Sequence, residues 1–144
     1  MKTLLLIVLV LIALGVAGFF YLGVKSKNGS ALGLSNGVLS PCPGTPNCVC
    51  SEAGEQEAFA IAPLPSSVWT KLPGFIEQSG GRITTQTDEY IAAEFVSSIF
   101  QFVDDVEFRK GDDAVHVRSA SRVGRSDLGA NAKRIESFRA ALDA

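Results

Sequence analysis

Histidine, methionine and tryptophan are nearly absent from this chain of 144 residues, which has one of each. The single imidazole, His116, removes most catalytic triads and histidine-rich metal sites from consideration. Charge is also scarce, at 19% of residues, and 13 basic side chains nearly balance 15 acidic ones. Since no basic stripe interleaved with aromatic residues is present, we expect no nucleic-acid partner.

Composition and length exclude disorder and a multidomain architecture. The chain is 47% apolar with a net charge of -2, whereas disordered chains combine low hydrophobicity with high net charge. A single domain commonly has roughly 100 to 200 residues, so the chain has room for one of moderate size.

The longest stretch without a charged residue runs from Leu4 to Val24. A helix over this stretch, rising 1.5 Å per residue, is about as long as the 30 Å hydrocarbon core of a bilayer. A cleaved signal peptide is the alternative, with Gly15-Val16-Ala17 as its small-residue cleavage site. The apolar run continues through Phe19-Phe20-Tyr21-Leu22 beyond that site, which favours an uncleaved transmembrane anchor over residues 1–24.

Three cysteines follow a Gly/Ser/Asn-rich stretch, residues 25–40, that we interpret as a flexible linker. Clustered cysteines in an exported domain usually form a disulfide, whereas in the cytosol they more often bind metal or do redox chemistry. Lysines at both ends of the apolar stretch leave its orientation open. From the cysteines we expect a single-pass protein of the cytoplasmic (inner) membrane, with the domain of residues 41–144 facing the periplasm or cell exterior.

The segment from Pro41 to Cys48 contains three prolines and a glycine, which predicts a tight, rigid loop. A disulfide between Cys42 and Cys48 would stabilise the fold by about 2 kcal/mol on the loop-entropy account. Cys50 would then be a free thiol or an intermolecular partner, and the alternative is that Cys50 itself pairs with Cys42. The string from Leu39 to Cys42 resembles a lipobox, but it lies too far beyond the apolar run and a proline precedes the cysteine, so we reject a lipoprotein.

Hydrophobic spacing in the domain predicts an α+β fold, a small antiparallel sheet packed with two helices. A first helix follows the N-cap candidates Ser66-Ser67 and is kinked or split at Pro73-Gly74. Period-two alternation then predicts strands near residues 82–87, 90–95, 100–108 and 115–117, with a hairpin turn at residues 110–113. The last helix begins near Ala130.

Two patterns that suggest chemistry are set aside. Residues 33–37 match the G-x-S-x-G nucleophile elbow as a string, but they lie in the linker, without a strand before and a helix after. A zinc site of the three cysteines with His116 lacks finger-like spacing and conflicts with an oxidising compartment. His116 is out of phase with its apolar neighbours on the predicted strand, so we expect it to face solvent or to be half-buried. We expect neither a bound metal nor a cofactor.

Asp104 shares its strand face with apolar residues, while Asp105 points the other way. An unpaired carboxylate on an apolar face is costly, so Asp104 should have a cationic partner, for which Arg118 and Arg122 are candidates. The alternative is that Asp104 or Asp105 acts as an acid or base in an enzyme. We favour the structural ion pair, because such pairs also perturb pKa values.

The densest polar constellation lies between the last strand and the last helix. Its candidate ligand-binding residues are Arg118, Ser119, Ser121, Arg122, Asp127 and Asn131. Guanidinium groups beside a helix N-terminus suit a phosphate or a carboxylate. The same arginines equally suit internal neutralisation of neighbouring aspartates.

Three stretches resemble, in order, the domain-of-unknown-function family 1499 of bacteria and plastids: CPGTPNCV at 42–49, FVDDVEF at 102–108 and VRSASRVG at 117–124, with Asp127-Leu128-Gly129 and Asn131 after them. The resemblance covers about residues 38 to 142. The family pattern C-P-x-x-P-N-C-V-S-S implies that Cys42 and Cys48 are the disulfide pair, and Cys50 departs from it where serine is usual. The family has no established activity, so the resemblance implies no reaction.

These observations favour a membrane-anchored extracytoplasmic domain that binds an anionic small molecule, a lipid headgroup or an envelope protein partner through the loop from Arg118 to Asn131. One alternative is a hydrolase in which Asp104 or Asp105 works with an arginine, although no nucleophile or metal set is recognisable. Another is a structural or assembly protein of the cell envelope with no small ligand. Between an enzyme and a protein without catalytic activity, we expect the latter.

Overall fold

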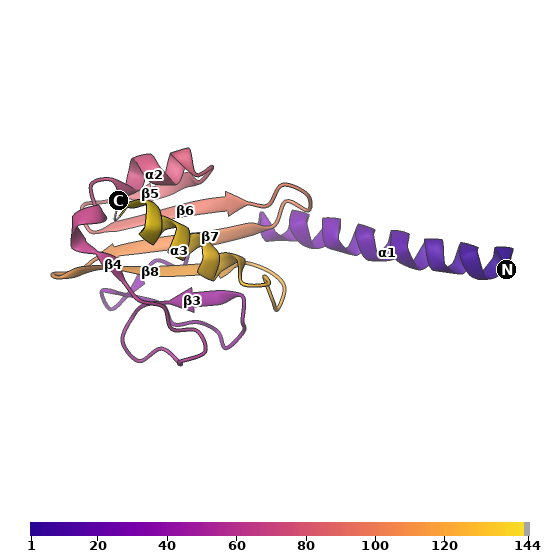
Figure 1. The fold of residues 1–144 in the computed structure, drawn as a ribbon, viewed down its shortest axis with the longest axis horizontal. Helices are drawn as coiled ribbons and strands as arrows, with labels where there is room; N and C mark the ends of the chain where they lie inside the picture. The colour runs from indigo at the N-terminus through magenta and orange to yellow at the C-terminus, as the bar shows by residue number, and fades with distance from the viewer. Residues whose placement is uncertain (143–144) are drawn as a thin grey trace.

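An antiparallel sheet forms the centre of the domain in the computed structural model, which describes residues 1–142 (Figure 1). The strand order is β3-β8-β7-β6-β5, and β4 pairs with β8 beside β3. The strands are β3 (Cys48–Cys50), β4 (Leu64–Pro65), β5 (Arg82–Gln86), β6 (Tyr90–Val96), β7 (Val103–Lys110) and β8 (Ala114–Ser121). The helices are α1 (Lys2–Ser26), α2 (Leu72–Gln78) and α3 (Ala130–Leu142). The expected α+β class is confirmed.

One face of the sheet is covered by α2 and α3, and we call it the helix-covered face. Alternation along β7 and β8 places Val106, Phe108 and Val117 there, all fully buried. The Phe138 ring of α3 stacks on Phe108, with ring centroids 5.6 Å apart, and Phe75 and Phe95 meet the same ring edge-on. This aromatic cluster fixes α3 over the middle of the sheet.

The opposite face, here the second face, is covered by the N-terminal part of the domain. A short hairpin of β1 (Leu34–Ser35) and β2 (Val38–Leu39) turns at Asn36-Gly37, where both residues have positive φ, as a type I′ turn requires. Leu39 is 1% exposed, and the Gly33 amide donates a hydrogen bond to Glu107. The stretch predicted as a flexible linker therefore makes contacts with the sheet that a free tether would not make.

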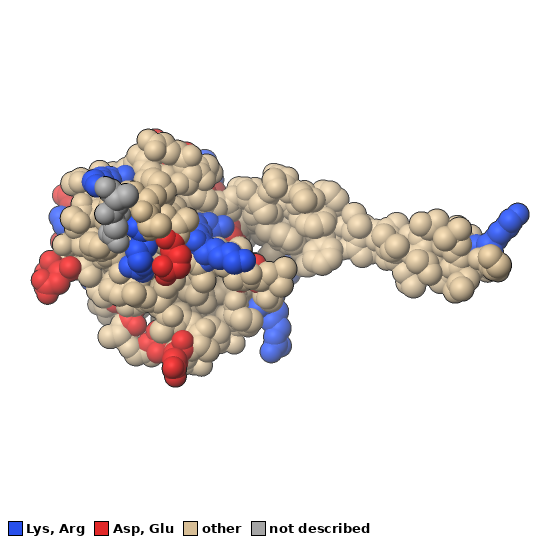
Figure 2. All heavy atoms as spheres, viewed as in Figure 1, with Lys and Arg blue, Asp and Glu red and all other residues tan. Residues whose placement is uncertain are grey.

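Helix α1 projects from one end of the domain (Figure 1), and its surface is bare of charge between the two ends (Figure 2). It is long and apolar enough to cross a membrane, with a mean hydropathy of 2.9 over its most apolar window and none of that window buried. A signal sequence has the same properties. The residues of α1 that the domain buries are Gly23 and Ser26, in its last turn, and one turn earlier Phe19 and Phe20 contact Phe100.

The predicted strands and helices of the domain correspond to β5 to β8, α2 and α3, whereas the short strands β1 to β4 were not predicted. The expected interruption of the helix that follows Ser66 is present as a split: a 3-10 turn at Ser66–Val68 precedes α2, which begins just before Pro73 because proline is suited to the first turn of a helix. The third predicted strand begins at Val103 rather than Phe100, since Phe100 and Phe102 turn toward α1 instead.

Candidate functional site

Five charged side chains, three of them buried and two partly buried, gather on the second face, and together they form what we call the ionic cluster: Asp105 and Glu107 of β7 and Arg118 of β8, with Glu94 of β6 and Arg122 just after β8. Strand register explains the grouping. Asp105 pairs with Ala120 and Glu107 with Arg118 across β7 and β8, so their side chains lie on one face. The alternation that buries the core on one side therefore gathers charge on the other.

Arg122 is held by two carboxylates. Its Nε and Nη2 donate to the two oxygens of Asp105 at 2.8 and 2.6 Å, and Nη2 also reaches Glu94 at 2.5 Å. The Asp105 hydrogen bonds raise the pKa of Arg122 above its ordinary value despite partial burial. Nη1 donates to the Ser26 carbonyl at the end of α1, at 3.3 Å. Arg122 therefore joins the sheet to the helix that carries the apolar surface.

Glu107 is completely buried and accepts three hydrogen bonds, from Arg118 Nη1 at 3.1 Å, the Tyr90 hydroxyl at 2.7 Å and the Gly33 amide at 2.8 Å. Burial and the Glu107 contact raise the pKa of Tyr90, so the phenol stays protonated. Arg118 Nε, by contrast, is buried without a hydrogen-bond partner within residues 1–142. A buried donor without an acceptor is uncommon and requires an explanation.

A cavity of about 510 Å³ adjoins these two arginines, and we call it the Arg118–Arg122 cavity. Lys25 from the end of α1 and residues 28–30 line its other side. Three cationic side chains, Lys25, Arg118 and Arg122, line it against one carboxylate, Asp105. More cationic than anionic side chains thus line the cavity, although Glu107 and Glu94 neutralise the two arginines, and Arg118 keeps one donor without a partner among the described residues.

Asp104 lies on the opposite side of the sheet from this cavity. Its carboxylate accepts a hydrogen bond from Arg134 Nη2 of α3 at 2.7 Å, so the expected cationic partner is present, but it is neither Arg118 nor Arg122. Arg134 also lies over the Phe95 ring, 4.8 Å from its centroid. Since Asp105 is held by Arg122, the two adjacent aspartates form ion pairs on opposite faces.

Ser119, Ser121 and Asn131 form a second, separate network under α3. The Asn131 amide donates to the Asn47 carbonyl and to Ser121 Oγ, both at 3.1 Å, and Ser119 Oγ donates to Asn131 Oδ1 at 2.5 Å. These side chains satisfy one another and tie α3 to the start of β3. The predicted binding loop is thus divided between two faces, and only its arginines form part of the ionic cluster.

Asp127 caps the N-terminus of α3. Its carboxylate oxygens accept the Gly129 amide at 3.0 Å and the Asn131 amide at 2.7 Å. These backbone amides at the start of α3, which the sequence pattern suggested as donors to an external anion, therefore already donate to the Asp127 carboxylate. Leu128, between them, has a left-handed backbone with φ 55 and is 88% exposed.

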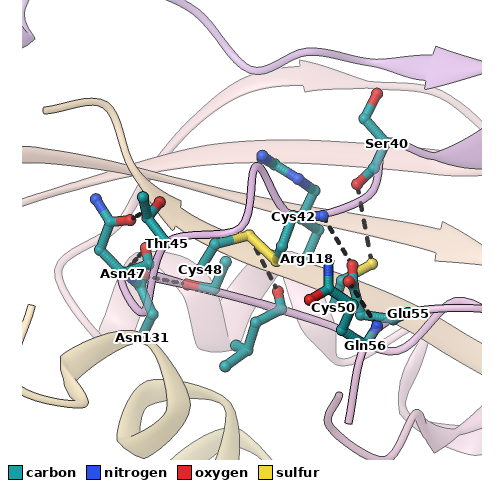
Figure 3. The surroundings of a disulfide bond; sticks show 12 residues. Ser40, Cys42, Thr45, Asn47, Cys48, Cys50, Glu55, Gln56, Arg118 and Asn131 are labelled. Carbon is teal, nitrogen blue, oxygen red and sulfur yellow. Dashed lines mark hydrogen bonds between the residues drawn. A yellow bond between two sulfur atoms is a disulfide. The ribbon is translucent and has the colours of Figure 1, made fainter. Parts of the chain in front are cut away.

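Cys42 and Cys48 form the disulfide, and Figure 3 shows it beside Arg118 and Cys50. Cys50 pairs in register with Arg118 across β3 and β8, and it is a free, fully buried thiol. Burial raises the pKa of Cys50, which keeps the thiol neutral and unreactive. The loop closed by the disulfide places the Asn47 carbonyl against Asn131.

His116 is half-buried on β8, as expected, with Nδ1 3.3 Å from the Ser51 carbonyl and 3.4 Å from Glu52 Oε2. Arg109 holds Glu52 with two hydrogen bonds of 2.7 and 2.9 Å. Burial alone would raise the pKa of Glu52, but the hydrogen bonds from Arg109 and the Leu39 amide and the nearby positive charges together lower it. Within residues 1–142, no group of three or more His, Cys, Asp or Glu side chains is arranged to hold a metal ion.

Sequence reasoning missed Glu94, Glu107 and Lys25 as parts of this region. Glu107 was detectable, because it shares a strand phase with Asp105. Glu94 and Lys25 come from distant segments and required the strand register and the helix placement. The Asn36-Gly37 pair was an available sign that the N-terminal stretch forms a hairpin.

The fold defines a class of protein: an α+β domain with an antiparallel sheet and one disulfide-closed loop, preceded in sequence by a single apolar helix. The chain belongs to the family described as "Protein of unknown function (DUF1499)", which matches residues 38–142. This confirms the resemblance noted in the sequence. No curated protein and no solved structure gives a match.

Proposed function

We propose that this protein is a membrane-anchored, extracytoplasmic binding protein that takes an anionic ligand, a phosphate or a carboxylate, into the Arg118–Arg122 cavity. One observation carries the proposal: Arg118 Nε is a buried donor without an acceptor among the described residues, at a cavity with three cationic side chains. A phosphate or carboxylate oxygen is the kind of acceptor that this donor lacks, and Arg118, which carries the donor, lines the cavity.

Two features support the proposed location. Helix α1 exposes its apolar side chains along its length, which suits lipid. The Cys42–Cys48 disulfide suits an oxidising compartment. The cavity lies where α1 enters the domain, since Lys25 and Asn28 line it, so its ligand is either a free anion or the headgroup of an anionic lipid.

The test is a melting experiment on the full chain in nanodiscs, followed by the fluorescence of Trp69, the single tryptophan. One arm adds inorganic phosphate or succinate to nanodiscs of neutral lipid, and another uses nanodiscs with anionic lipid and no added anion. A ligand at 100 times its dissociation constant stabilises the fold by about 2.7 kcal/mol. A shift in the first arm identifies a free anion, and a shift in the second alone identifies a headgroup.

Lys25→Gln is the informative variant, because Lys25 lines the cavity and its side chain takes part in no ion pair of residues 1–142. Lys27→Gln is the matched control, since Lys27 lines a different hollow. We expect the ligand-induced shift to fall in Lys25→Gln and to persist in Lys27→Gln. No shift with any anion in either arm contradicts the proposal.

A further inference from the structure

Backbone contacts fix α1 against the domain. A Cβ atom at Gly23 would lie 1.7 Å from the Phe100 carbonyl oxygen, so only glycine permits this approach. Ser26 Oγ accepts the Val103 amide at 3.1 Å and donates to the Gly23 carbonyl at 2.6 Å. The loop between β6 and β7 is therefore held at a defined height along α1.

That height lies within the apolar run. Gly23 comes just before Val24, the last residue before the Lys25 charge. The Phe100 ring reaches further toward the N-terminus, packing on Phe19 and Phe20 with centroids 5.1 and 5.3 Å away. Phe19 lies about 7 Å before Val24 along a helix that rises 1.5 Å per residue. A bilayer that covers the apolar run of α1 therefore also reaches the loop that holds Phe100.

A second loop lies at the same end. Residues 123–127, between β8 and α3, line a cavity of about 300 Å³ together with Phe19 and Leu22 of α1. Figure 1 shows both loops at the end of the domain from which α1 leaves, whereas the turn between β7 and β8 lies at the far end. We call the two loops, residues 97–102 and 122–129, the anchor-side loops.

The anchor-side loops carry exposed apolar side chains that the domain itself does not cover. Ile99 is 69% exposed and Leu128 is 88% exposed. Leu128 is also held in a left-handed conformation by the hydrogen bonds of Asp127, so the turn that presents it is fixed. Arg125, on the same loop, adds a cation near this apolar surface.

We propose that the anchor-side loops are embedded in the headgroup layer of the bilayer, with Ile99 and Leu128 inserted among the lipids, so that the domain docks on the membrane rather than standing away from it. Continuity with the apolar surface of α1 identifies lipid as the partner. The proposal rests on α1 remaining as an uncleaved anchor, which is part of the proposed function, but it is independent of anion binding.

The test places a fluorophore on single introduced cysteines in the full chain, reconstituted in nanodiscs. Cys50 is fully buried and Cys42 and Cys48 are joined, so the label goes to the new thiol. The test variants are Ile99→Cys and Leu128→Cys. Asp113→Cys, in the exposed turn between β7 and β8, is the matched control.

We expect lipids with a nitroxide near the headgroup to quench the probes at positions 99 and 128 at least several-fold more than the probe at 113. Equal quenching at all three positions overturns the proposal, as does quenching at 99 and 128 that rises with protein density instead of nitroxide content, which indicates a second copy. Melting with inorganic phosphate is measured on the same samples, so failure of docking and failure of anion binding are distinguished. A mature chain whose mass lacks residues 1–24 overturns the docking proposal independently.

Discussion

Arg118 forms an ion pair with Glu107 and, in the proposed function, also contributes to ligand binding with the same guanidinium. Its Nη1 neutralises the fully buried Glu107, while its Nε remains without a partner among residues 1–142. Removing one member of a buried ion pair leaves an uncompensated charge, which is more destabilising than removing both. Stability and ligand binding at this residue must therefore be measured with separate variants.

Arg118→Ala is expected to destabilise the domain by about 3 to 5 kcal/mol, because Glu107 is left charged in the interior. Arg118→Leu combined with Glu107→Gln is expected to be considerably less destabilising. Chemical denaturation measures both. Arg82→Ala is the control, since Arg82 is a largely exposed partner of Glu94, and a loss of at most about 1 kcal/mol is expected there. Equal losses in the single and double Arg118 variants would refute the role given to this pair.

The lowered pKa of Glu52 predicts that the stability of the fold depends on pH. Its pKa is lowered in the folded protein, so its contribution is present above the ordinary value of 4.5 and is lost as pH falls through the lower folded value. Glu52→Gln should therefore be less stable than the natural chain at neutral pH, and the difference should shrink below pH 4.5. Denaturation curves measured between pH 3 and pH 7 check this, and a difference independent of pH would contradict it.

At the residue scale, the sequence predicted that a carboxylate needs a cation but not which one. The expected partner of Asp104 was present, yet it came from α3, because Arg118 and Arg122 project to the other face. Alternation along one strand predicts which side chains share a face of the sheet. Which cation pairs with Asp104 depends on the register of the neighbouring strands and on where α3 packs. Asp127 was included among the candidate ligand-binding residues because it is close to the arginines in sequence, but its carboxylate caps the N-terminus of α3.

At the scale of elements, the contact between α1 and the β6–β7 loop decides how α1 is oriented against the domain. The contact depends on glycine at one position and on aromatic packing at others. A helix joined only by a mobile chain would leave the domain free to rotate.

Gly23→Ala is expected to separate α1 from the loop, because the added Cβ meets a backbone oxygen that no side-chain motion can clear. We expect faster proteolysis within residues 97–102 in nanodiscs. Gly18→Ala is the matched control, since a Cβ there meets nothing within 4 Å. Identical cleavage rates in the two variants would show that the contact does not hold the loop.

The disulfide loop is expected to stabilise the second face modestly. Replacing Cys42 and Cys48 together by serine should lower the free energy of unfolding by about 2 kcal/mol through the loop-entropy effect. The same variant should loosen α3, because the Asn47 carbonyl that accepts the Asn131 amide lies within the closed loop. Hydrogen exchange of the first turn of α3 measures this, and unchanged protection would contradict it.

The sequence predicted the long elements better than the short ones. Strands β5 to β8 and helix α3 have enough residues for a period to be visible. Strands β3 and β4 have three and two residues, and they exist because β8 offers an edge to pair with, which is tertiary information.

For the whole molecule, the two coverings of the sheet explain why the proposed binding site lies on the second face. Helices cover one face of the sheet with an apolar core, and the N-terminal stretch covers the other with the ionic cluster. That covering was beyond sequence reasoning, because residues 27–60 have no hydrophobic period. The result is a cavity lined by Lys25, Arg118 and Arg122 at the junction of the domain and α1.

The NMR signal of the Arg118 Nε–H group in the full chain, assigned by its loss in Arg118→Lys, reports directly on whether the Arg118–Arg122 cavity binds an anion. On titration with inorganic phosphate, or on transfer to nanodiscs with anionic lipid, we expect this resonance to shift and to saturate, as a donor that gains an acceptor should. A resonance that stays unchanged under both conditions, in a protein that remains folded, would contradict the assignment of this cavity as an anion-binding site.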